Sequence, residues 1–264
     1  MESGCLPDDW KVGNVPIFKK GSKQHPGNYR PISLTAIPCK TIECIVRDEL
    51  MAHLNRNGLL HDSQHGFRPR HSCVSQLLST LEDWSTVVEN GDPVDAVYLD
   101  FSKAFDSVSQ KHLLRKLKTY GVTGRLLNWI RSFLSGRRQR VIVNGSISGW
   151  VDVTSGVPQG SVLGSLLFVL YVNDLPAAVQ CNIKLFADDT KLYRSVRLAS
   201  DAELLQRDLV AAVAWSDEWL LPFNEAKCSS LHFGKSNAKR VYSMRGILLD
   251  QFSVERDLGV MVDT

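Results

Sequence analysis

Aspartates lie at the ends of apolar segments that alternate as β-strands do. Asp100 ends the run AVYLD at 96–100, and Asp188 and Asp189 lie between the two apolar halves of IKLFADDTKLY at 183–193. A carboxylate at the end of a buried strand is costly unless an opposite charge compensates it. Carboxylate oxygens are ligands that Mg²⁺ prefers, and two such ions can stabilise the attacking and leaving oxygens of a displacement. The pattern therefore predicts a site for two divalent cations, Mg²⁺ or Mn²⁺, and phosphoryl-transfer chemistry.

A second pair of adjacent aspartates shows that the surroundings carry most of this signal. Asp8 and Asp9 are also neighbours, but they lie in a polar N-terminal segment without apolar alternation on either side. The apolar flanks of 183–193 and the matching strand at 96–100 distinguish the predicted catalytic aspartates from this pair. On these features alone the sequence favours phosphoryl transfer.

Positive charge is concentrated in one interval of the chain. The net charge is only +3, yet no acidic residue lies between Asp106 and Asp152. The basic residues of this interval are Lys111, Arg115, Lys116, Lys118, Arg125, Arg131, Arg137, Arg138 and Arg140. Fixed positive charge without acidic partners suits a phosphate backbone, because counterion release supplies much of the affinity for nucleic acid. An ordinary solvated surface is the alternative that this feature alone leaves open.

The order of the predicted elements is mixed rather than an alternation of strands and helices. Periodicity predicts helices over 32–51, 72–90, 111–134, 160–175 and 203–221, strands over 94–100 and 228–233, and hairpins over 137–154 and 183–193. Ser72 is expected to cap its helix, and Asn144-Gly145 to turn the first hairpin. This order indicates an α+β fold, with an antiparallel sheet and helices on one face. A lobe boundary is expected near Asn90 to Pro93.

The remaining composition is that of a globular chain without a membrane segment. The 264 residues are 44% hydrophobic, and the longest uncharged apolar run, 162–172, is too short to span a bilayer. The six cysteines, at 5, 39, 44, 73, 181 and 228, show no metal-binding spacing. They are expected to be reduced thiols in an intracellular protein, whether nuclear or cytoplasmic.

Six segments, in this order, resemble the motifs of reverse transcriptases from LINE-type, non-LTR retrotransposons of the jockey-like kind. The segments are GNYRPISL at 27–34, QHGFRPRHS at 64–72, AVYLDFSKAFDSV at 96–108, SGVPQGSVLGSLLFVLYVNDL at 155–175, FADD at 186–189 and FNEAKCSSLHFG at 223–234. Together they extend over nearly the whole chain. The resemblance implies an RNA-directed DNA polymerase that uses an RNA template, a DNA primer and dNTPs, without a membrane or an obligate protein partner.

The resemblance also implies the fingers and palm of a right-hand polymerase. Residues 1–92 would form the fingers and 93–235 the palm, with fingers helices interleaved over 111–140, and 236–264 would begin a post-palm connection. Family members usually carry an endonuclease upstream and a helical thumb downstream. The chain is therefore expected to be truncated at both ends and to lack the thumb.

For the catalytic centre, the resemblance implies a role for each matching residue. Asp100 and Asp188 would bind both cations, the carbonyl of Phe101 would join the nucleotide-side cation, and Asp189 would support them. Lys227 matches a lysine proposed to protonate the pyrophosphate leaving group, and a simple surface lysine is its alternative. Asp106 is expected to cap the following helix rather than to bind metal.

Other matching residues would contact the nucleotide and the nucleic acid. Phe105 would exclude a 2′-hydroxyl and so select dNTPs, or else be an ordinary core residue. The remaining nucleotide contacts would be Gln159, Gly160, Arg30 and Lys19, with Lys20 competing for the role of Lys19. The template and primer contacts would be Phe67, Arg68, Arg137, Arg138 and Arg140. Two alternatives stay open: an RNA-dependent RNA polymerase, which Phe105 and the NYRPISL motif disfavour, and an inactive remnant that only binds nucleic acid.

Overall fold

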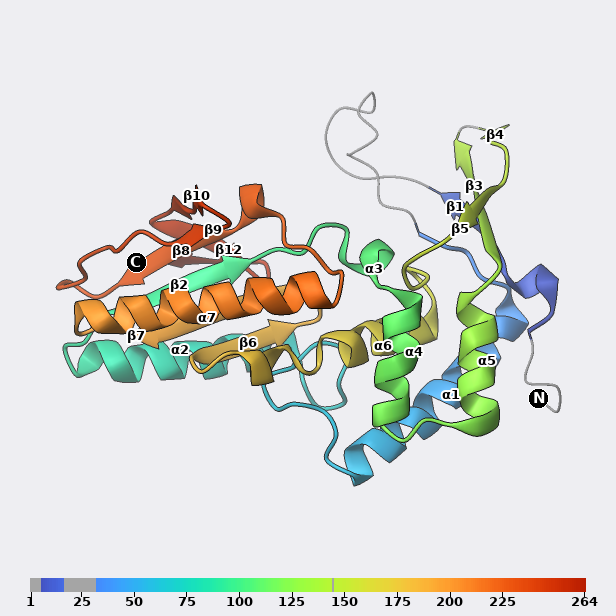
Figure 1. Cartoon of the computed structure of the whole chain (residues 1–264), viewed down its shortest axis with the longest axis horizontal. Helices are drawn as coiled ribbons and strands as arrows, with labels where there is room; N and C mark the ends of the chain where they lie inside the picture. Colours follow the sequence, from blue (N-terminus) through green and yellow to red (C-terminus); the bar gives the residue numbers. More distant parts are fainter. Residues whose placement is uncertain (1–5, 17–31, 144) are drawn as a thin grey trace. The chain divides into compact units, whose positions relative to one another are not determined.

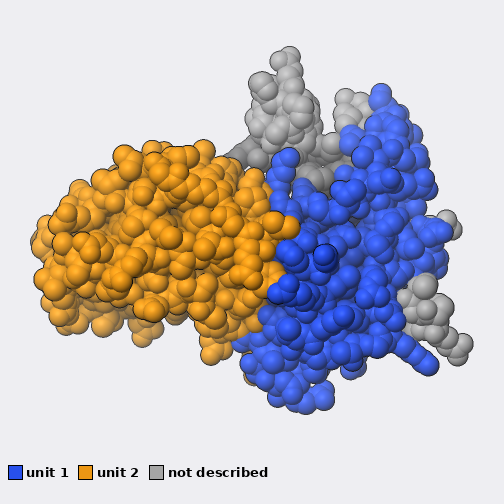
Figure 2. Space-filling view, viewed as in Figure 1, with its two compact units in different colours: residues 1–60, 103–171 blue, residues 61–102, 172–264 orange. Residues whose placement is uncertain are grey.

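The chain forms two compact units, each built from two separate stretches of sequence. The computed structural model describes residues 6–16, 32–143 and 145–264. Unit 1 combines Met1–Leu60 with Lys103–Tyr171, and unit 2 combines His61–Ser102 with Val172–Thr264 (Figure 2). Both units contain helices and strands, which confirms the predicted α+β class.

The units interleave in sequence. The boundary expected near Asn90 to Pro93 lies inside unit 2, and the helices expected over 111–140 lie in unit 1. The assignment of 1–92, 93–235 and 236–264 to fingers, palm and post-palm connection stays a prediction.

Unit 2 is built on a five-stranded sheet with the strand order β11-β8-β2-β7-β6 (Figure 1). Its strands are β2 (Val94–Leu99), β6 (Asn182–Phe186), β7 (Asp189–Ser195), β8 (Ser229–Phe233) and β11 (Asp250–Gln251). All neighbouring strands are antiparallel except β11, which is parallel to β8. The predicted antiparallel sheet is therefore confirmed, and the predicted strand and hairpin ranges match β2, β8 and β6–β7 to within a few residues.

Helices cover both faces of this sheet, not one face as the sequence suggested. Tyr193 on β7 donates to Asp83 on α2 (Cys73–Glu89), whereas Arg194 pairs with Asp208 on α7 (Ala199–Glu218). Consecutive residues of a strand point to opposite faces, so α2 and α7 lie on opposite sides of the sheet. A sheet covered on both faces buries consecutive residues of its strands, and five of the six residues of β2 are buried, including Asp95.

The described residues of unit 1 contain four longer helices: α1 (Ile37–Arg56), α4 (Gln110–Thr119), α5 (Gly124–Leu134) and α6 (Val162–Val172). The prediction of a single helix over 111–134 is wrong, because the helix is interrupted between α4 and α5. Gly121 follows the end of α4 with φ +80°, a left-handed conformation that commonly ends helices and that glycine adopts without strain. Helix α6 is apolar on all sides, and its neighbours cover it. The side chains of Lys116 and Tyr120 donate to carbonyls near its end, those of Tyr171 and Leu170.

A small sheet and several short elements complete the described chain. In unit 1, β1 (Val12–Pro16) pairs in parallel with β3 (Arg137–Val143), which also pairs with β4 (Ser146–Ile147) and β5 (Val151–Val153). The short helix α3 spans Ala104–Ser107, and the 3-10 turns are Asp8–Trp10, Leu175–Ala178 and Glu225–Lys227. The remaining strands of unit 2 are β9 (Ser243–Met244), β10 (Ile247–Leu248), β12 (Val254–Asp257) and β13 (Val260–Asp263).

Two sequence expectations can be compared directly with these elements. Among the described helices, none has the length and apolar character needed to cross a membrane. The five cysteines in the described ranges, at 39, 44, 73, 181 and 228, are free thiols.

Candidate active site

The strands of unit 2 bring the predicted catalytic aspartates to one end of the sheet. Leu99 pairs with Thr190 across the antiparallel strands β2 and β7. Asp100, which follows Leu99, and Asp189, which precedes Thr190, therefore lie at the same end of the sheet. Asp188 lies in the two-residue turn between β6 and β7, after Ala187, whose φ is +56°. A positive φ at the first turn position is typical of tight hairpins. Two segments far apart in sequence are therefore joined at the carboxylates.

These carboxylates influence one another electrostatically. The pKa of Asp189 is raised from 3.8 to about 6. The largest cause is partial burial of the carboxylate, and repulsion from the carboxylates of Asp188 and Asp100 adds to it. The ammonium of Lys227 compensates the negative charge of Asp100, because its Nζ lies 3.1 Å from both carboxylate oxygens of that residue. Lys227 is therefore no isolated surface lysine: it forms an ion pair with a predicted catalytic aspartate.

The donor chemistry fits a divalent cation, but the side chains are not gathered around one point. In residues 6–16, 32–143 and 145–264, no group of three or more His, Cys, Asp or Glu side chains is close enough to hold a metal ion. Carboxylate oxygens are the ligands that Mg²⁺ and Mn²⁺ take, and a cation there would relieve the repulsion at Asp189. Such an ion would compete with the Lys227 ammonium for Asp100.

The segment that carries Lys227 is fixed to the backbone beside Asp100. Asn224 N–H donates to the carbonyl of Asp100 at 2.7 Å, and the rings of Phe101 and Phe223 stack at 4.5 Å. The turn Glu225–Lys227 follows directly and delivers the lysine to Asp100. The side chain of Phe101 belongs to the core, with 4% of its surface exposed. The role predicted for its carbonyl stays a prediction.

Gln64 and Gly66 brace the aspartate turn, and the sequence did not single them out. The side-chain oxygen of the fully buried Gln64 accepts from Gly66 N–H at 2.7 Å and from Ala187 N–H at 3.0 Å. A Cβ on Gly66 would lie 2.3 Å from the nitrogen of Ala187. Only glycine allows this approach. The signal lay within the QHGFRPRHS motif, where Gln64 and Gly66 precede the two residues that the sequence did single out.

The two predicted template contacts of this loop differ in accessibility. Phe67 is 51% exposed and has φ +55°. The guanidinium of Arg68 is mostly buried and donates to the carbonyls of His61, at 2.7 Å, and Gln64, at 3.2 Å. Arg68 therefore holds the loop together, and a contact of either residue with template stays a prediction.

A buried ion pair lies on the same face of the sheet as Asp189. Lys191, two residues further along β7, forms an ion pair with Asp257 of β12, and the two side chains are 3% and 5% exposed. Tyr98 on β2 donates to the same Asp257 carboxylate at 3.2 Å. These contacts fasten the β12–β13 hairpin to the sheet. They join positions 66 and 159 residues apart, and nothing in the sequence pattern predicted them.

In unit 1, Phe105 packs in a way that suits both of its predicted roles. Its ring is partly exposed and stacks on Phe168 of α6, with centroids 4.7 Å apart. The capping role expected for Asp106 is wrong. The hydroxyl of Ser109 accepts from His112 N–H and caps α4, while Asp106 lies inside the short helix α3.

The Pro158–Ser161 segment forms a tight turn before α6. Ser161 N–H donates to the Pro158 carbonyl at 3.1 Å, and Gly160 has φ +90°. Glycine at the third position with this φ is typical of a type II turn. The carbonyl of Gln159 accepts from Ser33 N–H at 2.8 Å, and a Cβ on Gly160 would lie 2.9 Å from Ile32. The turn is therefore packed directly against the segment that follows the NYRP motif.

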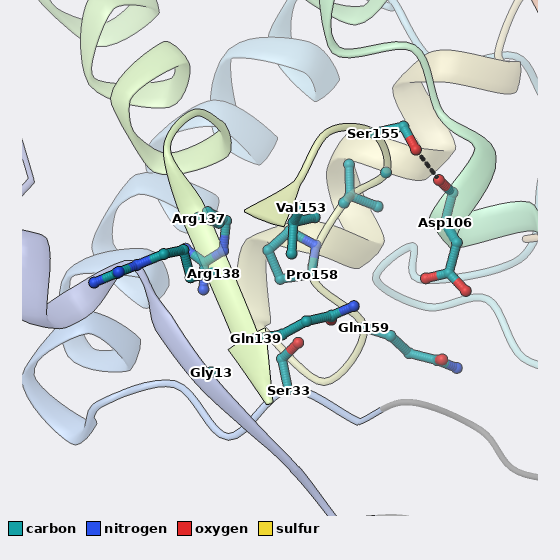
Figure 3. Close-up of a pocket in the computed structure, with 12 residues that line it drawn as sticks. Gly13, Ser33, Asp106, Arg137, Arg138, Gln139, Val153, Ser155, Pro158 and Gln159 are labelled. Atoms are coloured by element: carbon teal, nitrogen blue, oxygen red, sulfur yellow. Dashed lines mark hydrogen bonds between the residues drawn. The ribbon is translucent and has the colours of Figure 1, made fainter. Parts of the chain in front are cut away.

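This turn lines a small pocket of about 30 Å³ (Figure 3). The side chains of Gln139 and Gln159 extend to one side of it, and Arg138 extends to the other. The volume suits a water molecule and not a nucleotide. The predicted nucleotide contacts Lys19 and Arg30, with Lys20, lie outside the described residues.

The three arginines predicted to contact nucleic acid have different surroundings. Arg137 is 4% exposed and donates to the Phe133 carbonyl at 3.1 Å, so it belongs to the core, at odds with a phosphate contact. Arg138 and Arg140 lie over the exposed ring of Trp150, 5.8 and 4.4 Å from its centroid. The sequence did not single out Trp150. Its place directly before β5, the strand paired with the arginines of β3, was the signal that would have identified it.

Comparison with known proteins identifies the family. The model of the family described as reverse transcriptase (RNA-dependent DNA polymerase) matches residues 17–249. The chain is 31% identical, over 98% of its length, to the probable RNA-directed DNA polymerase from transposon BS of Drosophila melanogaster. It is 28% identical, over its full length, to the RNA-directed DNA polymerase from mobile element jockey of the same species. The chain spans about 30% of the length of each of these curated relatives.

Solved structures support the same fold. The chain superposes on apo telomerase from Candida tropicalis with a TM-score of 0.62 and 11% identity, covering 98% of this chain and 56% of that one. Telomerase from Candida albicans gives a TM-score of 0.63 at 14% identity, covering 97% and 47%. The family match covers most of the sequence, and the aspartate motifs lie inside it. The chain therefore belongs to the reverse transcriptase family, and its relatives are RNA-directed DNA polymerases of non-LTR retrotransposons.

Proposed function

We propose that this chain catalyses RNA-directed DNA synthesis, adding dNTPs to a primer 3′-hydroxyl on an RNA template. The observation that carries the proposal is the arrangement of Asp100, Asp188 and Asp189 at one end of a single sheet, with Lys227 paired to Asp100. Matching motifs in relatives named RNA-directed DNA polymerases support it.

In the proposed reaction, the primer 3′-oxygen attacks the α-phosphorus of the dNTP while the bond to the β-phosphate oxygen breaks. Asp100 and Asp188 would hold two divalent cations, with Asp189 and the carbonyl of Phe101 beside them. Bound there, the cations would supply electrostatic stabilisation of the attacking and leaving oxygens. Lys227 has an ammonium within reach of this carboxylate group and is the residue we assign to protonate the leaving pyrophosphate.

The remaining residues would position the substrates. We assign Phe105 to sugar selection, Gln159 and Gly160 to the nucleotide and template base, and Arg30 with Lys19 or Lys20 to the triphosphate. An arginine grips phosphate as a planar fork, whereas a lysine acts as a point charge. Phe67 is the more accessible candidate for a template contact in its loop, and Arg138 and Arg140 are the accessible ones on β3.

Primer extension on a defined template tests the proposal. The purified chain is incubated with oligo(dT) annealed to poly(A), dTTP, and either Mg²⁺ or Mn²⁺. Incorporation that needs RNA template, primer and metal, and that prefers dTTP to UTP, is expected. A preference for UTP would favour an RNA polymerase instead. Binding of the primer–template without incorporation under either metal would favour a non-catalytic nucleic-acid binder.

A further inference from the structure

A carboxylate occupies a core position on α1. The buried residues of this helix follow helical spacing and are otherwise apolar: Cys39, Glu43, Val46, Leu50, Met51 and Leu54. Glu43 is 0% exposed. A charged side chain at such a position is strongly unfavourable unless specific partners compensate it. What compensates Glu43 therefore indicates what it does.

The main partner of Glu43 is the beginning of α6. Its Oε2 accepts from Leu163 N–H at 3.0 Å, and Leu163 is the second residue of that helix. The first N–H groups of a helix have no partner within the helix, and the positive end of the helix dipole favours an anion there. Glu43 therefore caps α6 from another helix, 120 positions away in sequence.

Two further groups fix the carboxylate in this position. Cys39 Sγ donates to Oε1 at 3.4 Å. Burial, together with the adjacent Glu43, raises the pKa of Cys39 to about 12, so Cys39 keeps its proton and remains a donor. The buried guanidinium of Arg137 interacts electrostatically with both residues. Arg137, predicted to contact nucleic acid, thus has a structural partner inside the unit.

The helix that Glu43 caps starts immediately after the Pro158–Ser161 turn. Ser161 Oγ accepts from Gly164 N–H at 3.0 Å and donates to the Pro158 carbonyl at 2.7 Å, so turn and helix share one network. A Cβ on Gly164 would lie 2.6 Å from the Pro158 carbonyl oxygen, which shows how closely the turn lies on the helix. Displacement of the first turn of α6 would therefore displace Gln159 and Gly160.

We propose that Glu43 is a positioning residue for nucleotide binding: by capping α6, it holds the Gln159–Gly160 turn in the orientation that receives the dNTP. This inference rests on the nucleotide role proposed for that turn. Glu43 itself is not proposed to touch substrate or cation. Its contribution passes through Leu163 N–H and the network of Ser161.

The test combines dTTP affinity with amide exchange in four variants of the chain. Glu43→Ala removes the cap, Glu43→Asp keeps the charge but shortens its reach, and Glu43→Gln keeps an acceptor oxygen for Leu163 N–H. Glu49→Gln, at an exposed position of the same helix, is the matched control. Affinity for dTTP is measured by equilibrium binding to the chain loaded with oligo(dT)–poly(A) and Ca²⁺, which suppresses turnover. Hydrogen–deuterium exchange is followed in the peptide covering 157–165.

Glu43→Ala and Glu43→Asp should weaken dTTP binding about tenfold, as expected when the hydrogen bond from Leu163 N–H to a charged group is removed and the Gln159–Gly160 turn shifts. Exchange at 157–165 should accelerate by a similar factor. Glu43→Gln should lie within about threefold of wild type, because an amide oxygen still accepts from the same N–H. Primer–template affinity should not change in any variant. If Glu43→Ala does not fold, Glu43→Asp and Glu43→Gln carry the comparison.

Lower melting temperature with unchanged dTTP affinity of the folded variants would overturn the proposal and leave Glu43 a purely structural residue. Unchanged exchange at 157–165 would overturn it as well. Failure of the wild-type chain to bind dTTP would overturn both this inference and the proposed function, and it is recognised before any variant is compared.

Discussion

The charge of Asp189 is opposed by three carboxylates, those of Asp188, Asp100 and Asp257, and is favoured by the ammonium of Lys191. Asp100 has the Lys227 ammonium 3.1 Å away, whereas Asp189 is next to Asp188 and is further opposed by Asp257. Its raised pKa means that the folded chain binds this proton more tightly than the unfolded chain does. Ionisation of Asp189 therefore opposes folding when no cation is bound.

Replacement of Asp189 should stabilise the metal-free protein in a pH-dependent way. Above about pH 6 the wild-type carboxylate is charged, so Asp189→Asn should unfold at a higher urea concentration than wild type. As the pH falls from 6 towards 3.8, the wild-type side chain becomes neutral and the difference should vanish. Urea titrations in EDTA between about pH 4.5 and 8 measure this. A variant that is less stable at the upper end of this range, or a difference independent of pH, would contradict the assigned repulsion.

Phe105 allows a second test at the level of one side chain. If its ring excludes a 2′-hydroxyl, Phe105→Val should raise the use of UTP relative to dTTP by about tenfold or more, because a smaller side chain no longer clashes with the ribose. Steady-state incorporation on poly(A)–oligo(dT) gives the ratio. Phe168→Leu, which removes the buried core ring stacked on Phe105, shows whether disturbed packing alone changes the ratio. An unchanged ratio with reduced stability would make Phe105 a core residue.

At this scale the sequence predicted which aspartates the sheet brings together, but not the residues that support them. Asp100, Asp188 and Asp189 were found because strand alternation and motif context mark them. The pairing of Lys227 with Asp100 and the bracing by Gln64 join residues 127 and 123 positions apart, which local pattern does not encode. Asp106 was assigned a cap that Ser109 provides, because both are acceptable capping residues near the same helix.

Among the elements, the β6–β7 turn is held in place by a loop from elsewhere in the chain, residues 63–66. Gln64 and Gly66 hold the backbone of Ala187, the residue before Asp188. The same loop also holds the edge strand β6. Leu185 N–H donates to the Ser63 carbonyl, and the Leu185 carbonyl accepts from His65 N–H, both at 2.9 Å. The loop 63–66 thus serves as a short additional strand for the hairpin that carries two aspartates.

A methyl group at position 66 should disturb this turn. Gly66→Ala would place a Cβ 2.3 Å from the Ala187 nitrogen, so the turn or the loop must move, at a cost of roughly 1–3 kcal/mol. Chemical denaturation should report that loss of stability, and incorporation activity should fall with it. Gly149→Ala, where an added Cβ meets nothing within 4 Å, is the matched control. Equal stability of the two variants would show that the loop is free to adapt.

Element boundaries followed from the sequence where capping residues marked them. Ser72 caps α2 as expected, with a reciprocal bond between Ser72 and Ser75. The break between α4 and α5 was missed, although Gly121 was the available signal, because the apolar spacing continues across it. The sequence did not predict helices on both faces of the sheet. The apolar pattern of a single strand does not show whether one face of the sheet or both are covered by helices.

At the scale of the whole molecule, the distribution of positive charge predicts which surface would bind nucleic acid. Arg138 and Arg140 on β3 hold their guanidinium groups over Trp150, within the interval free of acidic residues. Aromatic rings with adjacent arginines suit single-stranded or hybrid nucleic acid, by stacking and by phosphate contact. The fold class was predictable from the order of elements. The interleaving of the two units was not, because it depends on packing between distant segments.

Binding to an RNA–DNA hybrid should therefore depend steeply on salt. The double variant Arg138→Gln/Arg140→Gln should lower the slope of log affinity against log salt by about 2, one for each phosphate group that is no longer neutralised. Arg207→Gln, at an exposed position of α7, should leave the slope unchanged. Fluorescence anisotropy between about 50 and 300 mM salt measures the slope. A slope equal to wild type in the double variant would remove β3 from the nucleic-acid interface.

Incorporation of a single dTMP under single-turnover conditions shows whether the paired strand ends carry the chemistry. Wild-type chain in excess over poly(A)–oligo(dT), with dTTP and Mg²⁺ or Mn²⁺, is compared with Asp188→Asn and with Asp8→Asn, which alters the aspartate pair outside the site. Wild type and Asp8→Asn should incorporate at similar rates, and Asp188→Asn should be slower by at least about 10³-fold, because charge stabilisation at the reacting oxygens supplies much of such catalysis. Incorporation by Asp188→Asn at the wild-type rate, with its fold intact, would show that the chemistry lies elsewhere in the chain.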